Sequence, residues 1–92
     1  MISFEAQIID PIGLHARPAA GISKLALAFT KEFDVKISIT SNGKTVNAAS
    51  TMSIMTLGAK SGQTFKLEVE GQNEEEIFNT IKDYMIKEKL IA

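Results

Sequence analysis

The chain has 92 residues, no cysteine, one histidine and a formal net charge of −1 at pH 7, and this length allows one domain over residues 1–92 with one modest core. The absence of cysteine excludes disulfides and cysteine metal sites, and a lone histidine argues against a histidine-rich metal centre, so we expect no metal and no cofactor. The lysines are scattered, which argues against a nucleic-acid partner, and no apolar run approaches the roughly 20 residues of a membrane span, so we expect a soluble cytoplasmic protein without membrane insertion.

The first predicted element is a strand over residues 2–8. Apolar side chains alternate there with polar ones, as expected for a strand with one buried face: the apolar ones are Ile2, Phe4, Ala6 and Ile8. A turn follows at Asp10-Pro11-Ile12-Gly13. A helix is then predicted from Ala16 to between Phe29 and Lys31, because apolar residues recur at spacings of three and four. Its inward stripe is Ile22, Leu25, Ala26 and Phe29, and its outward residues include Ser23, Lys24 and Thr30.

The junction between this strand and this helix contains the only histidine and the only arginine of the chain, in Gly13-Leu14-His15-Ala16-Arg17-Pro18-Ala19. Pro18 suits a first helical turn, where its missing N–H removes a donor that had no intrahelical partner. The first amides of a helix favour an anion, and Arg17 adds a cation that can bind two phosphate oxygens. A neutral imidazole is a nucleophile. The residues therefore describe either a histidine that accepts a phosphoryl group or a turn histidine beside an unrelated surface arginine.

A β-hairpin is predicted in the middle of the chain. Residues 34–40 alternate Val35, Ile37 and Ile39 with Lys36 and Ser38. The Asn42-Gly43 pair that follows is typical of a two-residue hairpin turn, because both residues tolerate positive φ. A second strand over residues 44–49 should then pair antiparallel with the first, and its weak strand formers Ala48 and Ala49 indicate a short edge strand.

A short helix of about two turns is predicted between Ser50 and Gly58. Ser50 has the position of an N-cap, and Gly58 can end the helix. Met52 and Met55 lie three residues apart on this helix. Each of them either belongs to the core or forms part of an adaptable docking surface, and one could face inward while the other faces partners.

The last two predicted elements are a strand and a helix. Phe65, Leu67 and Val69 alternate with charged residues in the strand. Asn73 is expected to cap the helix, and the glutamates that follow suit its positive pole, which makes a solvated helix start the main interpretation of this acidic run. The expected inward stripe is Ile77, Phe78, Ile81, Tyr84 or Met85, and Ile86.

The element order predicts an α/β two-layer fold of the α+β kind. The order is strand, helix, strand, strand, helix, strand, helix, or βαββαβα, and the strands are polar on one side. A four-stranded antiparallel sheet with three helices on one face satisfies this pattern.

Two stretches of the chain resemble the histidine-containing phosphocarrier protein (HPr) family of the phosphoenolpyruvate:sugar phosphotransferase system. The first is Gly13-Leu14-His15-Ala16-Arg17-Pro18-Ala19, which is similar to the family's active-site signature over seven consecutive positions. The second runs from Asn42 to Asn47 and on through Ser50, Met52, Met55 and Leu57-Gly58, and it resembles the segment that carries the family's regulatory serine. The resemblance covers essentially the whole chain.

The resemblance implies an open-faced β-sandwich with strand order 1-4-2-3, and a bacterial phosphoryl carrier rather than an enzyme. His15 would accept the phosphoryl group on Nδ1 from phospho-enzyme I and donate it to the IIA domains of sugar permeases. Ala16, Arg17 and Pro18 would bind the phosphate. The first helix and the short helix would form the partner surface, with Ala20, Lys24, Met52 and Met55. We also expect a monomer.

Ser50 has two possible roles, one from its position and one from the resemblance. Its position makes it a structural N-cap, whereas the resemblance implies a regulatory phosphorylation site. Regulation would bring in a serine kinase or phosphatase and a transcriptional regulator as partners. A second hypothesis for the whole protein follows from the same serine, namely a regulatory interaction protein without a carrier role. Such a paralogue would be expected to lack the histidine, and His15 is present.

Overall fold

Seven elements follow one another in the predicted order in the structure, a computed structural model that describes all of residues 1–92. They are β1 (Ile2–Gln7), α1 (Ala16–Glu32), β2 (Val35–Ser41), β3 (Lys44–Asn47), α2 (Thr51–Met55), β4 (Thr64–Gly71) and α3 (Glu74–Lys87).

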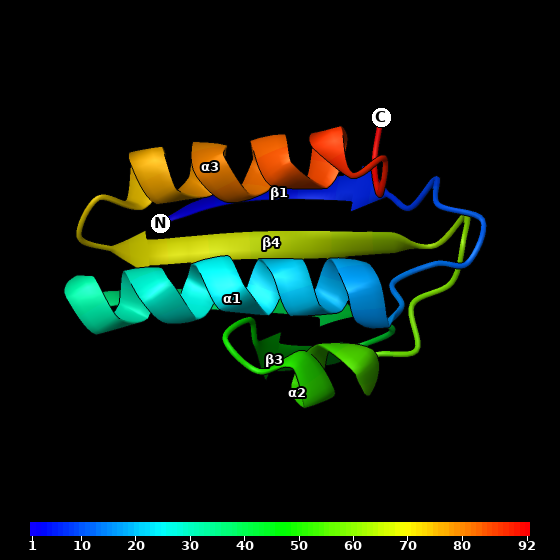
Figure 1. The fold of residues 1–92 in the computed structure, drawn as a ribbon, viewed down its shortest axis with the longest axis horizontal. Helices are drawn as coiled ribbons and strands as arrows, with labels where there is room; N and C mark the ends of the chain where they lie inside the picture. Colours follow the sequence, from blue (N-terminus) through cyan, green and yellow to red (C-terminus); the bar gives the residue numbers. More distant parts are fainter.

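The four strands form one antiparallel sheet in the order β1-β4-β2-β3. In its register, Leu67 of β4 lies between Phe4 of β1 and Ile39 of β2. All three helices lie on the same side of the sheet, with α1 and α3 side by side and α2 next to α1 (Figure 1). One face of the sheet is therefore packed and the other is open, which explains why the strands alternate apolar and polar residues. The predicted two-layer, open-faced sandwich is confirmed.

The core is a single cluster of 20 buried apolar residues between the helices and the sheet. Ile22 and Ala26 of α1 are completely buried, and Leu25 and Phe29 are partly buried against the cluster, so the predicted stripe of α1 is confirmed. The remaining large, fully buried side chains come from β2, α2, β4, α3, the residue after β1 and the segment after α3: Ile8, Ile37, Ile39, Ile54, Leu67, Val69, Ile77, Ile81, Met85 and Leu90.

Ser23 is buried, contrary to the prediction that it faces water. Its Oγ donates to the carbonyl oxygen of Ala20 at 3.0 Å and lies 2.5 Å from Oγ1 of Thr51. A serine hydroxyl has one proton, so Thr51 is the donor in the second bond. Burial is tolerated because both hydroxyls are hydrogen-bonded, and the pair joins α1 to the start of α2.

Two predictions about α3 are wrong. Ile86 was expected in the core but is 41% exposed, because Ile77, Ile81 and Met85 form the inward stripe and Ile86 lies beside it. Asn73 occupies the N-cap position, but its φ of 53° is left-handed and its side chain makes no cap hydrogen bond. Tyr84, one of two candidates for the stripe, is half-buried, and Met85 takes the core position.

Strand β3 ends at Asn47 rather than at Ala49. The Asn47 side-chain oxygen accepts a hydrogen bond from the N–H of Ala49 at 2.9 Å, which bends the chain out of the sheet. Ala48 is then completely buried. The segment therefore enters α2 from a turn rather than from a continuing strand.

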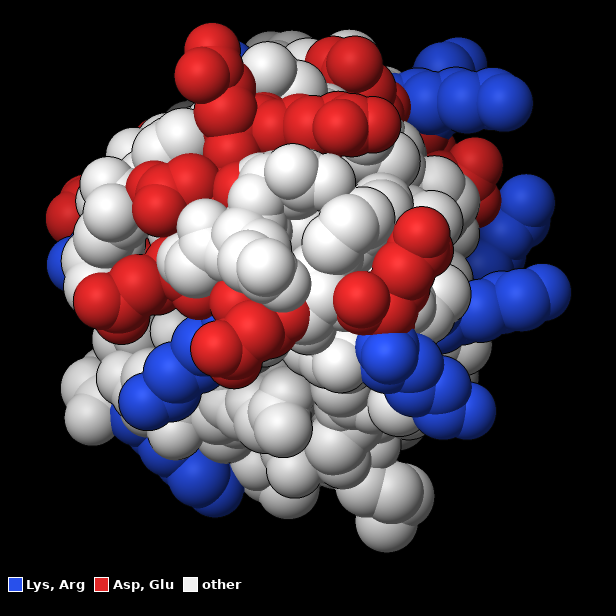
Figure 2. Space-filling view, turned by 90° about the vertical axis from the view of Figure 1, so that its left-hand side faces the viewer, with Lys and Arg blue, Asp and Glu red and all other residues white.

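The two ends of the molecule differ. The loop before α1, the loop before β4 and the end of the chain lie together at one end, whereas the β4–α3 connection lies at the other (Figure 1). Acidic side chains gather on this second end (Figure 2), where Glu74, Glu75 and Glu76 make up the first turn of α3. No helix is long and apolar enough to span a membrane.

Candidate functional site

The loop before α1 fixes the backbone that leads into His15. The N–H of Gly13 donates to the carbonyl oxygen of Asp10 at 2.9 Å, and the N–H of Leu14 donates to that of Ala59 at 2.9 Å. Gly13 has a φ of +87°, and a Cβ at this position would approach the oxygen of Ala59 to 2.7 Å, so only glycine fits here. Leu14 is buried. The next residue, His15, is therefore held by a turn and a buried anchor.

His15 is the N-cap of α1, with extended backbone and no side-chain cap hydrogen bond. Its carbonyl oxygen accepts from the N–H of Ala19 at 3.0 Å. The amides of Ala16 and Arg17 have no acceptor within the protein, and Pro18 has no N–H to satisfy. Because the side chain of His15 does not cap the helix, these two amides and the positive end of the helix dipole are available to an anion beside the imidazole.

The imidazole of His15 is held by Asp10. Its Nε2 lies 3.2 Å from Oδ2 of Asp10, and the other carboxylate oxygen, Oδ1, accepts from the N–H of Ile12 at 2.9 Å. The two side chains are 28% and 18% exposed, respectively. The N–H of Ile12, with a smaller contribution from His15, holds the pKa of Asp10 below its ordinary value. Asp10 is therefore ionised at neutral pH. One of its oxygens contacts the backbone of Ile12 and the other contacts the ring of His15.

Arg17 faces the end of α3. Its Nε lies 3.7 Å from Oε1 of Glu88, and the Arg17 side chain is 82% exposed. An ion pair of this length and exposure is weak. The guanidinium can therefore leave Glu88 for another anion at little cost.

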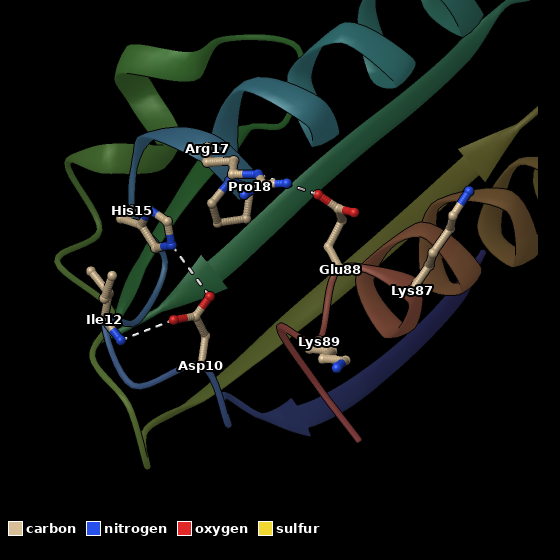
Figure 3. Close-up of a pocket in the computed structure, with 8 residues that line it drawn as sticks. All are labelled: Asp10, Ile12, His15, Arg17, Pro18, Lys87, Glu88 and Lys89. Atoms are coloured by element: carbon tan, nitrogen blue, oxygen red, sulfur yellow. Dashed lines mark hydrogen bonds and ion pairs between the residues drawn. The ribbon is translucent and has the colours of Figure 1, made fainter.

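These groups surround one hollow of about 380 Å³ (Figure 3). His15 and Arg17 project into it from the start of α1, and the last residue of α3 with the two residues after it borders it on the opposite side. Its lining is Asp10, Ile12, His15, Arg17, Pro18, Lys87, Glu88 and Lys89. No cluster of three or more histidine, cysteine or acidic side chains is placed to hold a metal ion.

The structure brings together the predicted residues His15, Ala16, Arg17 and Pro18, but the other residues that line the hollow were not predicted. The sequence pattern indicates only a turn at Asp10, although an aspartate five positions before a histidine, across a Pro–Gly turn, is itself a signal for a side-chain contact. Glu88 could not be found in this way, because nothing in the sequence shows that the end of α3 packs beside the start of α1.

The four residues predicted for a partner surface are all exposed. Ala20 and Lys24 lie on the outer side of α1. Met52 and Met55 are 76% and 43% exposed, so the alternative that either belongs to the core is wrong. Ile54 supplies the buried side chain of α2 instead. Since α1 packs against α2, these residues belong to neighbouring helices.

Ser50 is the N-cap of α2, as predicted. Its Oγ accepts from the N–H of Ser53 at 3.2 Å. Ser50 is half-buried, and the exposed Met52 follows two residues later. The structural role of this serine is therefore confirmed.

The sequence matches the model of the PTS HPr component phosphorylation site family over residues 2–87. The chain belongs to the HPr family. Its members are phosphocarrier proteins of the phosphotransferase system and not enzymes in their own right, and the chain is a phosphocarrier of this kind.

The chain is also similar to individual members of the HPr family over most of its length. The phosphocarrier protein HPr of Mycoplasma capricolum is 35% identical over 91 residues, which cover 99% of this chain and 98% of that protein. HPr of Buchnera aphidicola is 46% identical over 74 residues, covering 80% and 82%. Among solved structures, a mycoplasma histidine-containing phosphocarrier protein superposes with a TM-score of 0.91 at 34% identity, covering 99% of both chains.

Proposed function

We propose that His15 accepts a phosphoryl group from phospho-enzyme I and donates it to the IIA domains of sugar permeases. The observation that carries this proposal is that three kinds of group lie together at the start of α1. They are the imidazole of His15, the unpaired amides of Ala16 and Arg17, and the weakly held guanidinium of Arg17. A nucleophile beside a ready site for a dianion is what a phosphoryl carrier needs.

The transfer is a substitution at phosphorus. The lone pair of the His15 Nδ1 forms the new P–N bond while the bond from phosphorus to the donor breaks, and the donor leaves with that electron pair. The amides of Ala16 and Arg17 and the Arg17 guanidinium stabilise the charge on the phosphoryl oxygens during transfer. Arg17 moves from Glu88 to the phosphate in this step, which its weak pairing and its exposure favour.

We assign partner binding to the surface formed by Ala20, Lys24, Met52 and Met55. These side chains are exposed on two helices that pack against each other. Methionine side chains are flexible and polarizable, so they can adapt to partners of different shape. One shared surface would allow a single-domain, monomeric carrier in the cytoplasm to meet its donor and its acceptors in turn.

A regulatory role of Ser50 is the second part of the proposal. A phosphate on the Ser50 oxygen would add about −1.5 to −2 charges close to Met52 and Met55. A serine kinase and phosphatase would set this charge, and a transcriptional regulator would bind the modified surface. The partial exposure of Ser50 and its position just before Met52 and Met55 support this role.

The relay can be tested with purified components. Phosphoenolpyruvate labelled in its phosphoryl group is incubated with enzyme I, this protein and a IIA domain. We expect label in the IIA domain only when the protein is present, and none with His15→Ala, which should remain folded because the His15 ring contributes little to the core. Label reaching the IIA domain through the His15→Ala protein would contradict the proposal.

A further inference from the structure

We propose that Asp10 is a positioning residue that holds the His15 ring in the tautomer with the proton on Nε2 and the lone pair on Nδ1. This inference rests on the proposed role of His15 and adds the group that selects the reacting nitrogen. Asp10 does not touch the phosphoryl group in this scheme. It acts only through the imidazole.

The geometry of Asp10 leaves it little freedom. Its Oδ1 is held by the N–H of Ile12 at 2.9 Å, within the same turn. That bond directs Oδ2 toward His15, where it lies 3.2 Å from Nε2 (Figure 3). The turn is held in addition by the bond from the N–H of Gly13 to the carbonyl oxygen of Asp10. A carboxylate fixed at both oxygens sets the orientation of the ring it contacts.

The chemistry of a carboxylate decides the tautomer. An ionised carboxylate can only accept hydrogen bonds, so the Nε2 that faces it must carry a proton. A neutral imidazole has one N–H, and its other nitrogen, here Nδ1, keeps the lone pair. The backbone N–H of Ile12 keeps the pKa of Asp10 low, so this arrangement holds at neutral pH.

The same contact assists the transfer step. When Nδ1 of His15 forms its bond to phosphorus, the ring becomes cationic with the proton still on Nε2. The charge of Asp10 then faces a positive ring across 3.2 Å, much as a buried aspartate stabilises the imidazolium in a catalytic triad. In the reverse direction, the ring leaves phosphorus as a neutral imidazole with Nε2 protonated. Asp10 therefore keeps the ring ready for the next cycle.

Glu88, the other carboxylate of the hollow, does not share this role. It pairs with Nε of Arg17 at 3.7 Å and has no contact with the imidazole. Glu88→Gln therefore serves as a matched control, because it removes one carboxylate charge from the same hollow without touching the ring.

The informative variant is Asp10→Asn. Its single side-chain oxygen is needed by the N–H of Ile12, so its NH₂ group faces Nε2 of His15. An NH₂ group can only donate, which forces Nε2 to accept and moves the ring proton to Nδ1. The variant keeps the shape of the turn and reverses the tautomer. The chemical shifts of the Ile12 and Gly13 amides report whether the turn is retained.

The experiment is ¹⁵N NMR of the His15 ring at a pH where the ring is neutral, together with the rate of phosphorylation by phospho-enzyme I. We expect a protonated Nε2 and an unprotonated Nδ1 in the wild type and in Glu88→Gln, and the reverse in Asp10→Asn. We also expect phosphorylation of Asp10→Asn to be slower by about 10–100-fold, by analogy with the loss of a carboxylate that orients a metal-binding histidine.

The tautomer is read in the unphosphorylated protein, so this test does not depend on the carrier function. A wild-type ring protonated on Nδ1 overturns the role of Asp10, even if Asp10→Asn fails to fold. An Asp10→Asn protein with the reversed tautomer and an unchanged rate also overturns it. Absence of phosphorylation in a wild type that shows the expected tautomer contradicts the proposed function instead.

Discussion

Arg17 must exchange its ion pair with Glu88 for a contact with the phosphoryl group during transfer. Its pairing with Glu88 is long and exposed, so Arg17→Ala should alter the free energy of unfolding by no more than about 0.5 kcal/mol. A hydrogen bond between charged groups in the transferring complex is worth about 1.5–3 kcal/mol. We therefore expect transfer into and out of the protein to slow by about 10–100-fold.

Rapid-quench measurements of both transfer steps check this expectation. Lys31→Ala is a suitable control, because Lys31 is an exposed cation in the last turn of the same helix, far from the hollow. Equal rates for wild type and Arg17→Ala in both directions would show that Arg17 is only a surface residue.

Tyr84 should make the protein sensitive to alkaline pH. Burial of its hydroxyl, with a smaller contribution from Glu88, raises the pKa of Tyr84 above its ordinary value of 10.0. Tyrosine in the unfolded chain ionises near this ordinary value, so the stabilisation is complete below about pH 10 and is lost as the pH rises through the folded pKa. Tyr84→Phe keeps the ring and lacks the ionisation.

Melting temperatures of the wild type and Tyr84→Phe between pH 8 and about pH 11 test whether ionisation of Tyr84 destabilises the folded protein. We expect the wild type to lose stability relative to Tyr84→Phe only at the alkaline end. A constant difference over the whole range would mean that the Tyr84 hydroxyl ionises equally easily in the folded and unfolded states.

The contact between α1 and α3 depends on Gly21. A Cβ at this position would overlap the phenol ring of Tyr84. Alanine is favoured over glycine in a helix by about 1 kcal/mol, but overpacking costs about 1–3 kcal/mol. We expect Gly21→Ala to destabilise the wild type and to stabilise a Tyr84→Ala background.

A double-mutant cycle by chemical denaturation measures this coupling. The sign of the Gly21→Ala effect should reverse between the two backgrounds. The same sign and size in both would show that α3 does not pack on Gly21 as described.

Two substitutions of Ser50, at the start of α2, separate its role as a helix cap from the effect of a negative charge at this position. Ser50→Ala removes the bond to the N–H of Ser53 and should cost about 1 kcal/mol. Aspartate is a good N-cap, so Ser50→Asp should keep the melting temperature nearly unchanged. We nevertheless expect Ser50→Asp to bind enzyme I more weakly and to slow phosphorylation of His15, because it brings a negative charge to the partner surface.

The measurement is the salt dependence of the phosphorylation rate for the wild type and both variants. A slower rate at low salt for Ser50→Asp alone, which diminishes as salt screens the charge, supports regulation by phosphorylation. Equal rates for Ser50→Asp and wild type at low salt would leave Ser50 only as a helix cap.

Helices and strands could be predicted from the sequence where apolar residues recur periodically. Their ends, and the burial of single residues, could not be predicted where one side-chain contact determines them. The strands and the long helices follow from alternation and from spacings of three and four. The burial of Ser23 depends on Thr51, which lies 28 positions away in the sequence. The end of β3 depends on a side-chain bond of Asn47, and the orientation of Asn73 depends on a left-handed backbone. No periodicity encodes such contacts.

The whole molecule has its candidate site and its acidic cluster at opposite ends. The hollow is bordered by Arg17, Lys87 and Lys89, whereas the glutamates of the first turn of α3 lie at the far end (Figure 2). The fold produces this separation, because α1 begins where α3 ends. The motif around His15 predicted from sequence that His15 and Arg17 lie together at the start of α1. Asp10 and Glu88 reach them only through the turn and the helix packing.

The site of phosphorylation tests the central claim most directly. The protein, labelled with ¹⁵N, is phosphorylated with enzyme I and phosphoenolpyruvate, and the phosphorylated residue and atom are identified by intact mass and by ³¹P–¹⁵N correlation. We predict one acid-labile phosphoryl group per chain, bonded to Nδ1 of His15. A phosphoryl group on Nε2, on another residue, or on a His15→Ala protein would contradict the account.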